Sequence, residues 1–445
     1  MDQTFVKQST LCTLPIECRQ AILCYLPDMH ALKAAVLSHP AMYSAFIDRD
    51  EWILSRIMGK VIPGDLLPDA IFEYSSSALE NDSWTRERVL NLIEQHGAHH
   101  VPSSFKWTPG AAFHMQTFYR HVRFFTLGFV DSAFEVYPAL QGRAVSSPEW
   151  CRMARSFYRV EIYRHLFRRR DHVQKKPSPD FPYHEQTEIY YERFAAFELE
   201  QLACVSEYLF RKVLTPFNEI AAHDIVWASK AVGYSMTEPW QSFNPATRIG
   251  NVISQGLAFL HGMLTAETYE KRYQLLTPNI SRVNTFLPNA LWFLFPRDEG
   301  DTELLRDYDS EELALYTTPE APESDPGPVE VWRQAHLDKT LRDFVYSMDM
   351  REKRRWGYAL WDYGRLAQLE VFDRPFTRAP TPDYGEAELL EAVTGSLVTR
   401  WKLWWKGARG WWSEEDQSQV RWEGHELDLS DEELELEGFH NRVLL

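Results

Sequence analysis

Apolar residues recur every three to five positions along most of the chain, with charged and amide side chains between them. From Glu188 to Leu214 this spacing predicts one long amphipathic helix, which we expect to end at Pro216. The same spacing predicts helices over residues 86–95, 150–169, 220–233, 246–264, 328–349 and 389–405. Alternating β-branched runs joined by Asn-Gly or Asp-Gly turns are absent, so hairpins have little support. The pattern predicts an all-α fold.

The sharpest local pattern lies between Leu14 and Phe46 and predicts three short helices. Pro15 suits a first helical turn, and Pro27 ends that helix. Asp28 is a suitable cap for the second helix, and Pro40 starts a third. Three helices in about 33 residues are too few to cover all their own leucines, so this unit needs a neighbour, either the rest of the chain or another protein.

These residues resemble an F-box, the short helical module that docks on the Skp adaptor of cullin-based ubiquitin ligases. The Leu-Pro entry of the family corresponds to Leu14 and Pro15, its acidic position to Glu17, and its first-helix hydrophobic positions to Ile22 and Leu26. The second-helix hydrophobic positions correspond to Leu32, Val36 and Leu37. The family's usual third-helix Trp is missing, and the run from Ser38 to Tyr43 resembles a variant of fungal F-box-like proteins.

The resemblance implies a three-helix F-box-like module on a large irregular helical body. It implies a non-catalytic substrate receptor that binds the Skp adaptor of a cullin ligase core and recruits a protein target through the body. The adaptor-binding residues that it implies are Leu14, Pro15, Ile16, Glu17, Ile22, Leu26, Leu32, Val36, Leu37 and Tyr43. Among these we expect Leu14, Pro15, Leu32 and Leu37 to be exposed.

Charge is concentrated in two segments. Residues 298–330 carry twelve acidic side chains and one basic, and residues 413–438 carry eleven and one. Because they account for −11 and −10 of a net charge of −17, the remainder is near neutral at +4. We divide the chain into the F-box-like module (1–60), the helical body (61–297), an acidic Pro-rich linker or loop (298–330), Trp-rich C-terminal helices (331–412) and an acidic tail (413–445).

Two further segments give specific expectations. Four prolines and several acids between Thr317 and Pro328 predict an exposed, mobile loop. Trp401, Trp404 and Trp405 lie among basic residues, and we expect these three rings to pack mostly on the chain's own core; a partner or membrane contact is the alternative.

Motifs for catalysis, nucleotide binding or metal binding are absent from the sequence, including GxxxxGK[ST], GxGxxG, HExxH and GxSxG. We therefore expect no enzymatic activity and no cofactor, and the acidic charge argues against nucleic acid as a partner. Five cysteines without a CxxC pair, no basic-then-apolar start and no long apolar run predict an intracellular protein of the cytoplasm or nucleus, without a membrane span. Two alternatives remain: a helical scaffold whose F-box-like helices complete its own core, and an enzyme with a site assembled from distant residues.

Overall fold

Helices dominate the fold, as the sequence predicts. The computed structural model describes residues 11–79, 84–96, 101–102, 105–167, 181–234, 243–280, 287–292, 294, 302–320, 323–373 and 386–423. Within these ranges the β-structure is one small antiparallel pair of strands and an isolated bridge. The prediction of an all-α chain with a large helical body is therefore confirmed.

The chain divides into two units, each built from separate stretches of sequence. Unit 1 comprises Met1–Leu202, Leu294–Val345 and Trp356–Arg374, and unit 2 comprises Ala203–Phe293, Tyr346–Arg355 and Pro375–Leu445. The helix α10 (Ala196–Ala221) contributes residues to both units. The other helices of unit 1 are α1 (Ile16–Tyr25), α2 (Met29–Ser38), α3 (Pro40–Asp48), α4 (Asp50–Val61), α5 (Leu67–Ser77), α6 (Arg86–Gln95), α7 (Pro109–Val136), α8 (Ser147–Phe167), α9 (Tyr183–Gln186), α16 (Ser310–Thr317), α17 (Gly327–His336) and α19 (Tyr363–Gln368).

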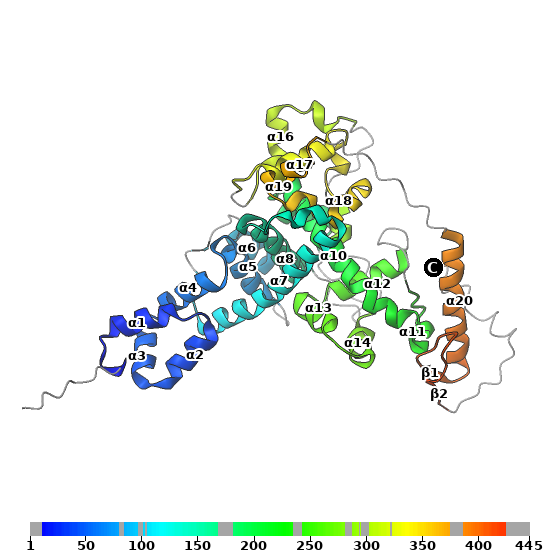
Figure 1. The fold of residues 1–445 in the computed structure, drawn as a ribbon, viewed down its shortest axis with the longest axis horizontal. Coiled ribbons are helices and arrows are strands. Elements are labelled where there is room, and N and C mark those ends of the chain that lie inside the picture. The colour runs from blue at the N-terminus through cyan, green and yellow to red at the C-terminus, as the bar shows by residue number, and fades with distance from the viewer. Residues whose placement is uncertain are drawn as a thin grey trace, which may run out of the picture. The chain divides into compact units, whose positions relative to one another are not determined.

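The three predicted N-terminal helices form as α1, α2 and α3, and Figure 1 shows them side by side, with α4 leading away from them. We call α1 to α3 the N-terminal module. The Asp28 carboxylate accepts a hydrogen bond from the Ala31 backbone N–H at 2.8 Å and so caps α2. His39 has an extended backbone, and Pro40 occupies the first turn of α3. Prolines and capping residues in the sequence therefore determine where these helices begin.

The helix α7 supplies the neighbour that the module needs. It is 28 residues long and packs against α2 and α4, as well as against α5 and α8. The buried Gln116 side chain on α7 accepts a hydrogen bond from the backbone N–H of Met29 at 2.8 Å, and Phe113 contacts His30 edge to face. Thus α7 joins the module to the rest of unit 1.

A buried arginine joins two distant stretches of unit 1. Arg365 on α19 is 2 % exposed and forms two 2.8 Å hydrogen bonds with the Glu149 carboxylate on α8. It also donates to the backbone carbonyls of Leu140, Arg143 and Ala144 at 2.6 to 2.8 Å. Arg365 thus forms five charge-assisted hydrogen bonds with residues more than 200 positions earlier in the sequence. These bonds hold two distant stretches of unit 1 together.

Unit 2 contains short helices and the small sheet. They are α11 (Ile225–Ser229), α12 (Phe243–Ile253), α13 (Leu257–Leu264), α14 (Tyr269–Leu276), α15 (Leu287–Trp292), α18 (Arg351–Arg355), α20 (Glu386–Trp405), β1 (Ala408–Gly410) and β2 (Val420–Trp422). Helices α11 and α20 pack together and against β1. The fully buried Arg400 donates to the Asp224 backbone carbonyl at 2.8 Å, and burial lowers the pKa of its guanidinium to about 10.

Several sequence expectations about local structure are wrong. The long helix begins at Ala196 rather than Glu188, and the helix predicted over residues 328–349 ends at His336. Pro216 does not end a helix, because α10 continues through it to Ala221. Phe217 and Ile220 on the continuing turns are fully buried, and this burial offsets the cost of a proline inside a helix. The hairpin of β1 and β2 was not expected from the sequence because a long connection, rather than a two-residue turn, joins its strands.

Gly327 at the start of α17 occupies a position where a side chain does not fit. A Cβ there would lie 2.3 Å from the Tyr363 backbone nitrogen and 2.8 Å from the Asp362 carbonyl carbon. Gly327→Ala should therefore lower the free energy of unfolding by about 1–3 kcal/mol, measured by denaturant titration. The matched control is Gly59→Ala on α4, where a Cβ meets no atom within 4 Å; we expect it to stabilise by up to about 1 kcal/mol. Equal effects at the two glycines would contradict the close approach.

Candidate functional site

Helix α1 carries apolar side chains on two opposite sides. Leu23 and Cys24 point into the module and are buried with Gln20. Ile22 and Tyr25 are 36 % and 82 % exposed, although both are large and apolar. At 100° per residue these two lie on the side of α1 opposite the buried residues. A helix that is apolar on both sides has more apolar surface than its own core uses.

Helices α2 and α3 repeat this arrangement. Leu37 on α2 is 70 % exposed, and Tyr43 and Ile47 on α3 are each 53 % exposed. Tyr43 and Ile47 are four positions apart, so they share one side of α3. Both α1 and α2 pack against α3, so these exposed side chains belong to one small module. We call these side chains the exposed apolar set; its members are Pro15, Ile22, Tyr25, Leu37, Tyr43 and Ile47.

The remaining predicted contact residues divide between surface and core. Glu17 is exposed, whereas Leu14, Ile16 and Leu26 are partly buried. Leu32 is 2 % exposed and Val36 is 9 % exposed, because the i, i+4 spacing places both on the side of α2 that faces the module's own core. The expectation that Leu32 is exposed is therefore wrong. The expectation is correct for Pro15 and Leu37, and Leu14 is intermediate.

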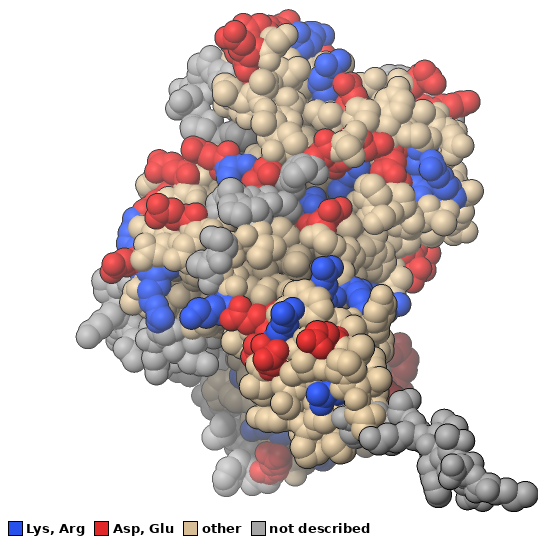
Figure 2. All heavy atoms as spheres, turned by 90° about the vertical axis from the view of Figure 1, so that its left-hand side faces the viewer, with Lys and Arg blue, Asp and Glu red and all other residues tan. Residues whose placement is uncertain are grey.

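The module surface is poor in charge. Between Leu14 and Ile47 the chain has two acidic and two basic residues. Figure 2 looks onto this face of unit 1, where most atoms near the module are neither acidic nor basic and the charged side chains are scattered. Beyond the module, Trp52 on α4 is 40 % exposed, with the Arg56 guanidinium 5.9 Å from its ring centroid. Such a surface suits a protein partner better than a nucleic acid.

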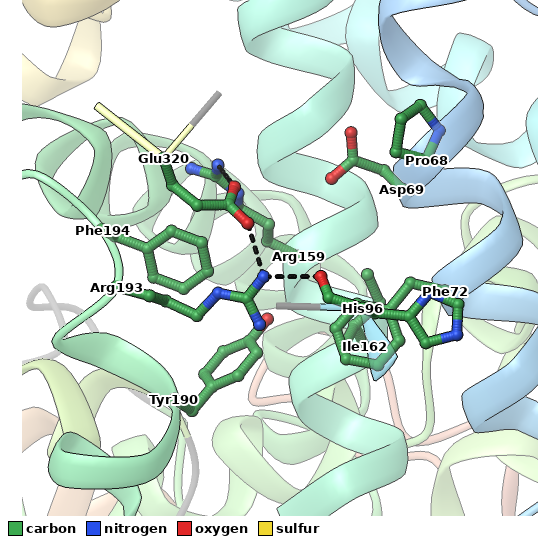
Figure 3. Close-up of a pocket in the computed structure, with 10 residues that line it drawn as sticks. All are labelled: Pro68, Asp69, Phe72, His96, Arg159, Ile162, Tyr190, Arg193, Phe194 and Glu320. Atoms are coloured by element: carbon green, nitrogen blue, oxygen red, sulfur yellow. Dashed lines mark hydrogen bonds and ion pairs between the residues drawn. The ribbon is translucent and has the colours of Figure 1, made fainter. Parts of the chain in front are cut away.

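A small pocket lies elsewhere in unit 1, between α5, α8 and the turn before α10 (Figure 3). The Arg193 guanidinium contacts the Glu320 carboxylate at 2.5 Å and the His96 backbone carbonyl at 2.8 Å. The Arg159 guanidinium stacks over Phe194 at 4.2 Å and bonds the same Glu320 carboxylate at 3.1 Å. The pocket is about 20 Å³, which is room for one water molecule.

The pocket shows that the predicted exposed loop is largely engaged. The Glu320 and Glu323 side chains are 8 % and 15 % exposed, and Gly327 and Pro328 are buried. The expectation of an exposed segment over residues 317–328 is wrong at these positions, although Thr318, Ser324 and Pro326 are exposed. The physical reason is charge: the acids of this segment pair with arginines 120 or more positions away.

A buried carboxylate between two histidines is another group of titratable side chains in unit 1. Glu73 on α5 is 1 % exposed and contacts His114 Nε2 at 3.0 Å and His165 Nε2 at 3.5 Å. Burial alone would raise the pKa of Glu73, but hydrogen bonds and charge from the two histidines hold it below its ordinary value. The hydrogen bond to Glu73 raises the pKa of His114.

This pair makes the stability of the protein depend on pH. A raised folded-state pKa means that the His114 contribution is fully present below its unfolded pKa of about 6.5 and is lost as pH rises through the folded value. His114→Gln should therefore destabilise more at pH 5.5 than at pH 8.5. Urea titrations of both proteins at the two pH values measure this difference, and an effect independent of pH would contradict the pairing.

The Trp-rich segment is partly buried in unit 2. Trp401, Trp404 and Trp405 are all intermediate in exposure, and the ring of Trp405 lies 5.7 Å and 5.6 Å from the other two ring centroids. Trp404 packs against the cluster of Ile225, Ala408 and Trp412, so contact with the chain's own core accounts for part of this surface. The predicted acidic tail is described only as far as Glu423.

Metal-ligand geometry is not found in the described part of the chain, where no three His, Cys, Asp or Glu side chains converge on a common point. None of the described helices combines the length and apolar character needed to cross a bilayer. In comparisons with known proteins, no family model, curated protein or solved structure matches this chain. We take the exposed apolar set as the candidate functional site.

Proposed function

We propose that this protein is a non-catalytic substrate receptor of a Skp–cullin-type ubiquitin ligase. The observation that carries the proposal is the exposed apolar set on a charge-poor three-helix module whose entry is Leu14-Pro15. In this proposal the module binds the Skp adaptor, the helical body binds a protein target, and the complex acts in the cytoplasm or nucleus. Ubiquitin transfer is carried out by the ligase core.

The packing of the module supports its use as a docking unit. Leu23, Leu32, Met42 and Phe46 fill its inside, so it keeps its shape without a partner. α7 and α4 cover another part of it, as the Met29–Gln116 hydrogen bond shows. Anchors at protein interfaces are large apolar or aromatic side chains that are preorganised on a stable scaffold. Tyr25, Leu37 and Tyr43 have this character.

The alternative is a helical scaffold in which the module only completes the fold. The burial of Leu32 and Val36 favours it, because two of the hydrophobic positions expected at the adaptor serve the protein's own core. The two functions differ in one measurable property. A receptor binds the adaptor through side chains that are already exposed, and a scaffold does not bind it at all.

Isothermal titration calorimetry of the full chain with purified Skp adaptor tests the proposal. We expect saturable one-to-one binding with a dissociation constant of about 1 μM or below, accompanied by a negative heat-capacity change from apolar burial. Absence of binding at an adaptor concentration of about 100 μM would reject the receptor function and leave the scaffold. Co-purification of adaptor and cullin with the chain from its native cell is the second supporting result.

A further inference from the structure

Three arginines on α8 form a row on one side of the helix. Arg152, Arg155 and Arg159 are three and four positions apart, so they project in nearly the same direction. All three are less than 9 % exposed. Each has a carboxylate from the folded body: Arg152 contacts Asp362 at 2.7 Å, Arg155 contacts Asp69 at 3.5 Å and Arg159 contacts Glu198 at 2.9 Å. The folded body alone therefore supplies one carboxylate for each arginine of this row.

A second set of carboxylates reaches this row from the acidic segment. We call residues 318–320 and 323–325 the acidic strap. Glu323 forms two bonds with the Arg152 guanidinium, at 2.7 and 2.9 Å, and Glu320 bridges Arg159 and Arg193. Burial alone would raise the pKa of Glu323, but Arg152 holds it below its ordinary value, so the strap binds as an anion. The backbone N–H of Glu320 also donates to Glu198 at 2.8 Å.

Removal of the strap leaves each of the three arginines on α8 with one carboxylate partner. Arg152, Arg155 and Arg159 each keep the carboxylate that the body supplies. Loss of the strap therefore does not leave a buried arginine of α8 without any carboxylate, which would strongly destabilise the fold. The strap itself exposes Thr318 and Ser324 and has few large apolar side chains to hold it. Its contacts with Arg152, Arg159 and Arg193 are ionic, and ionic contacts exchange for those of a competing anion. Asp325 also accepts a hydrogen bond from the Tyr363 backbone N–H at 2.7 Å, which holds the end of the strap that leads into α17.

Arg193 depends on the strap more than the arginines of α8 do. Glu320 is the carboxylate that contacts its guanidinium, and the remaining bond goes to the His96 carbonyl. The Arg193 Nε and Nη1 atoms are buried and have no hydrogen-bond partner among the described residues. Arg193 lines the small pocket beside Phe194, which gives the site an aromatic wall (Figure 3).

We propose that Arg152, Arg159 and Arg193 form a binding surface for an acidic segment of a partner protein, which the acidic strap occupies in the isolated chain. The partner segment has two carboxylates three positions apart in its sequence, as Glu320 and Glu323 are. The strap competes with it and sets a threshold for its binding. No residue of α1 to α3 takes part, so this surface is independent of the adaptor-binding function.

A labelled peptide with the sequence of residues 316–327 is the probe, and fluorescence anisotropy on the full chain is the measurement. The variant Glu320→Gln/Glu323→Gln weakens the strap and should bind the peptide at least about tenfold more tightly than the wild type. Adding Arg193→Gln to this variant should remove the gain. Glu303→Gln/Glu311→Gln, which removes two exposed acids of the same region, is the matched control and should behave like the wild type.

Two results would overturn the proposal. The first is a folded Glu320→Gln/Glu323→Gln variant that binds the peptide no better than the control variant. The second needs only the wild type: amide hydrogen exchange should be at least about a hundredfold faster in the strap than in α8, and excess peptide should accelerate it further. If the amide hydrogens of the strap exchange at the rate of those in α8, the strap is a permanent part of the core and the proposal is wrong. Neither measurement contains the adaptor, so its outcome is separate from that of the receptor function.

Discussion

Replacement of Arg365 by alanine should lower the free energy of unfolding by about 3–5 kcal/mol. The substitution leaves the Glu149 carboxylate buried at 1 % exposure without the guanidinium that binds both of its oxygens. It also removes the donors that satisfy the carbonyls of Leu140, Arg143 and Ala144. Chemical denaturation of wild type and variant, followed by circular dichroism, measures the change.

Replacing both Arg365 and Glu149 distinguishes the loss of their attraction from the cost of leaving the Glu149 charge buried without a partner. Arg365→Met/Glu149→Met takes away both charges and should recover at least about 1 kcal/mol relative to Arg365→Ala. The exposed pair of Arg306 and Asp338, at 2.7 Å, is the matched control, and Arg306→Ala should change stability by less than about 1 kcal/mol. Similar losses at Arg365 and Arg306 would contradict the structural role of the buried network.

The sequence predicts the local features of this fold well. Pro15, Asp28 and Pro40 determine where the N-terminal helices begin, because proline geometry and side-chain capping act within one helical turn. The helix α6 begins and ends where periodicity places it, at Arg86 and Gln95. Such signals depend only on neighbouring residues, so they can be read without the tertiary structure.

Features that depend on distant residues could not be predicted in this way. The charge of residues 298–330 indicates an exposed loop, yet Glu320 and Glu323 pair with arginines more than 120 positions earlier. Pro216 is a helix breaker by local rules, and the burial of Phe217 and Ile220 overrides it. At the candidate site, the sequence predicted the three helices of the module, but the resemblance led us to expect both Leu32 and Leu37 to be exposed. Leu32 shares the buried side of α2 with Val36, and only Leu37 faces outward.

Leu32 and Leu37 should therefore give opposite results when each is changed to alanine. Leu32 is 2 % exposed, so Leu32→Ala should lower the free energy of unfolding by about 2–5 kcal/mol through the cavity that it leaves. Leu37 is 70 % exposed, so Leu37→Ala should change stability by less than about 0.5 kcal/mol. If the module binds the Skp adaptor, Leu37→Ala should weaken that binding by about thirtyfold, as loss of an interface anchor does.

Leu315 on α16 is the matched control, because it is 76 % exposed and lies outside the module. Leu315→Ala should alter neither stability nor adaptor binding, which separates a specific anchor from a general loss of surface apolarity. Titration calorimetry with the adaptor and urea denaturation give the two readouts for all three variants. A Leu37→Ala variant that keeps wild-type affinity would place the adaptor contact elsewhere on the module, with Tyr25 and Tyr43 as the next positions to test. Loss of stability in that variant would instead show that Leu37 packs inside the protein, as the scaffold alternative requires.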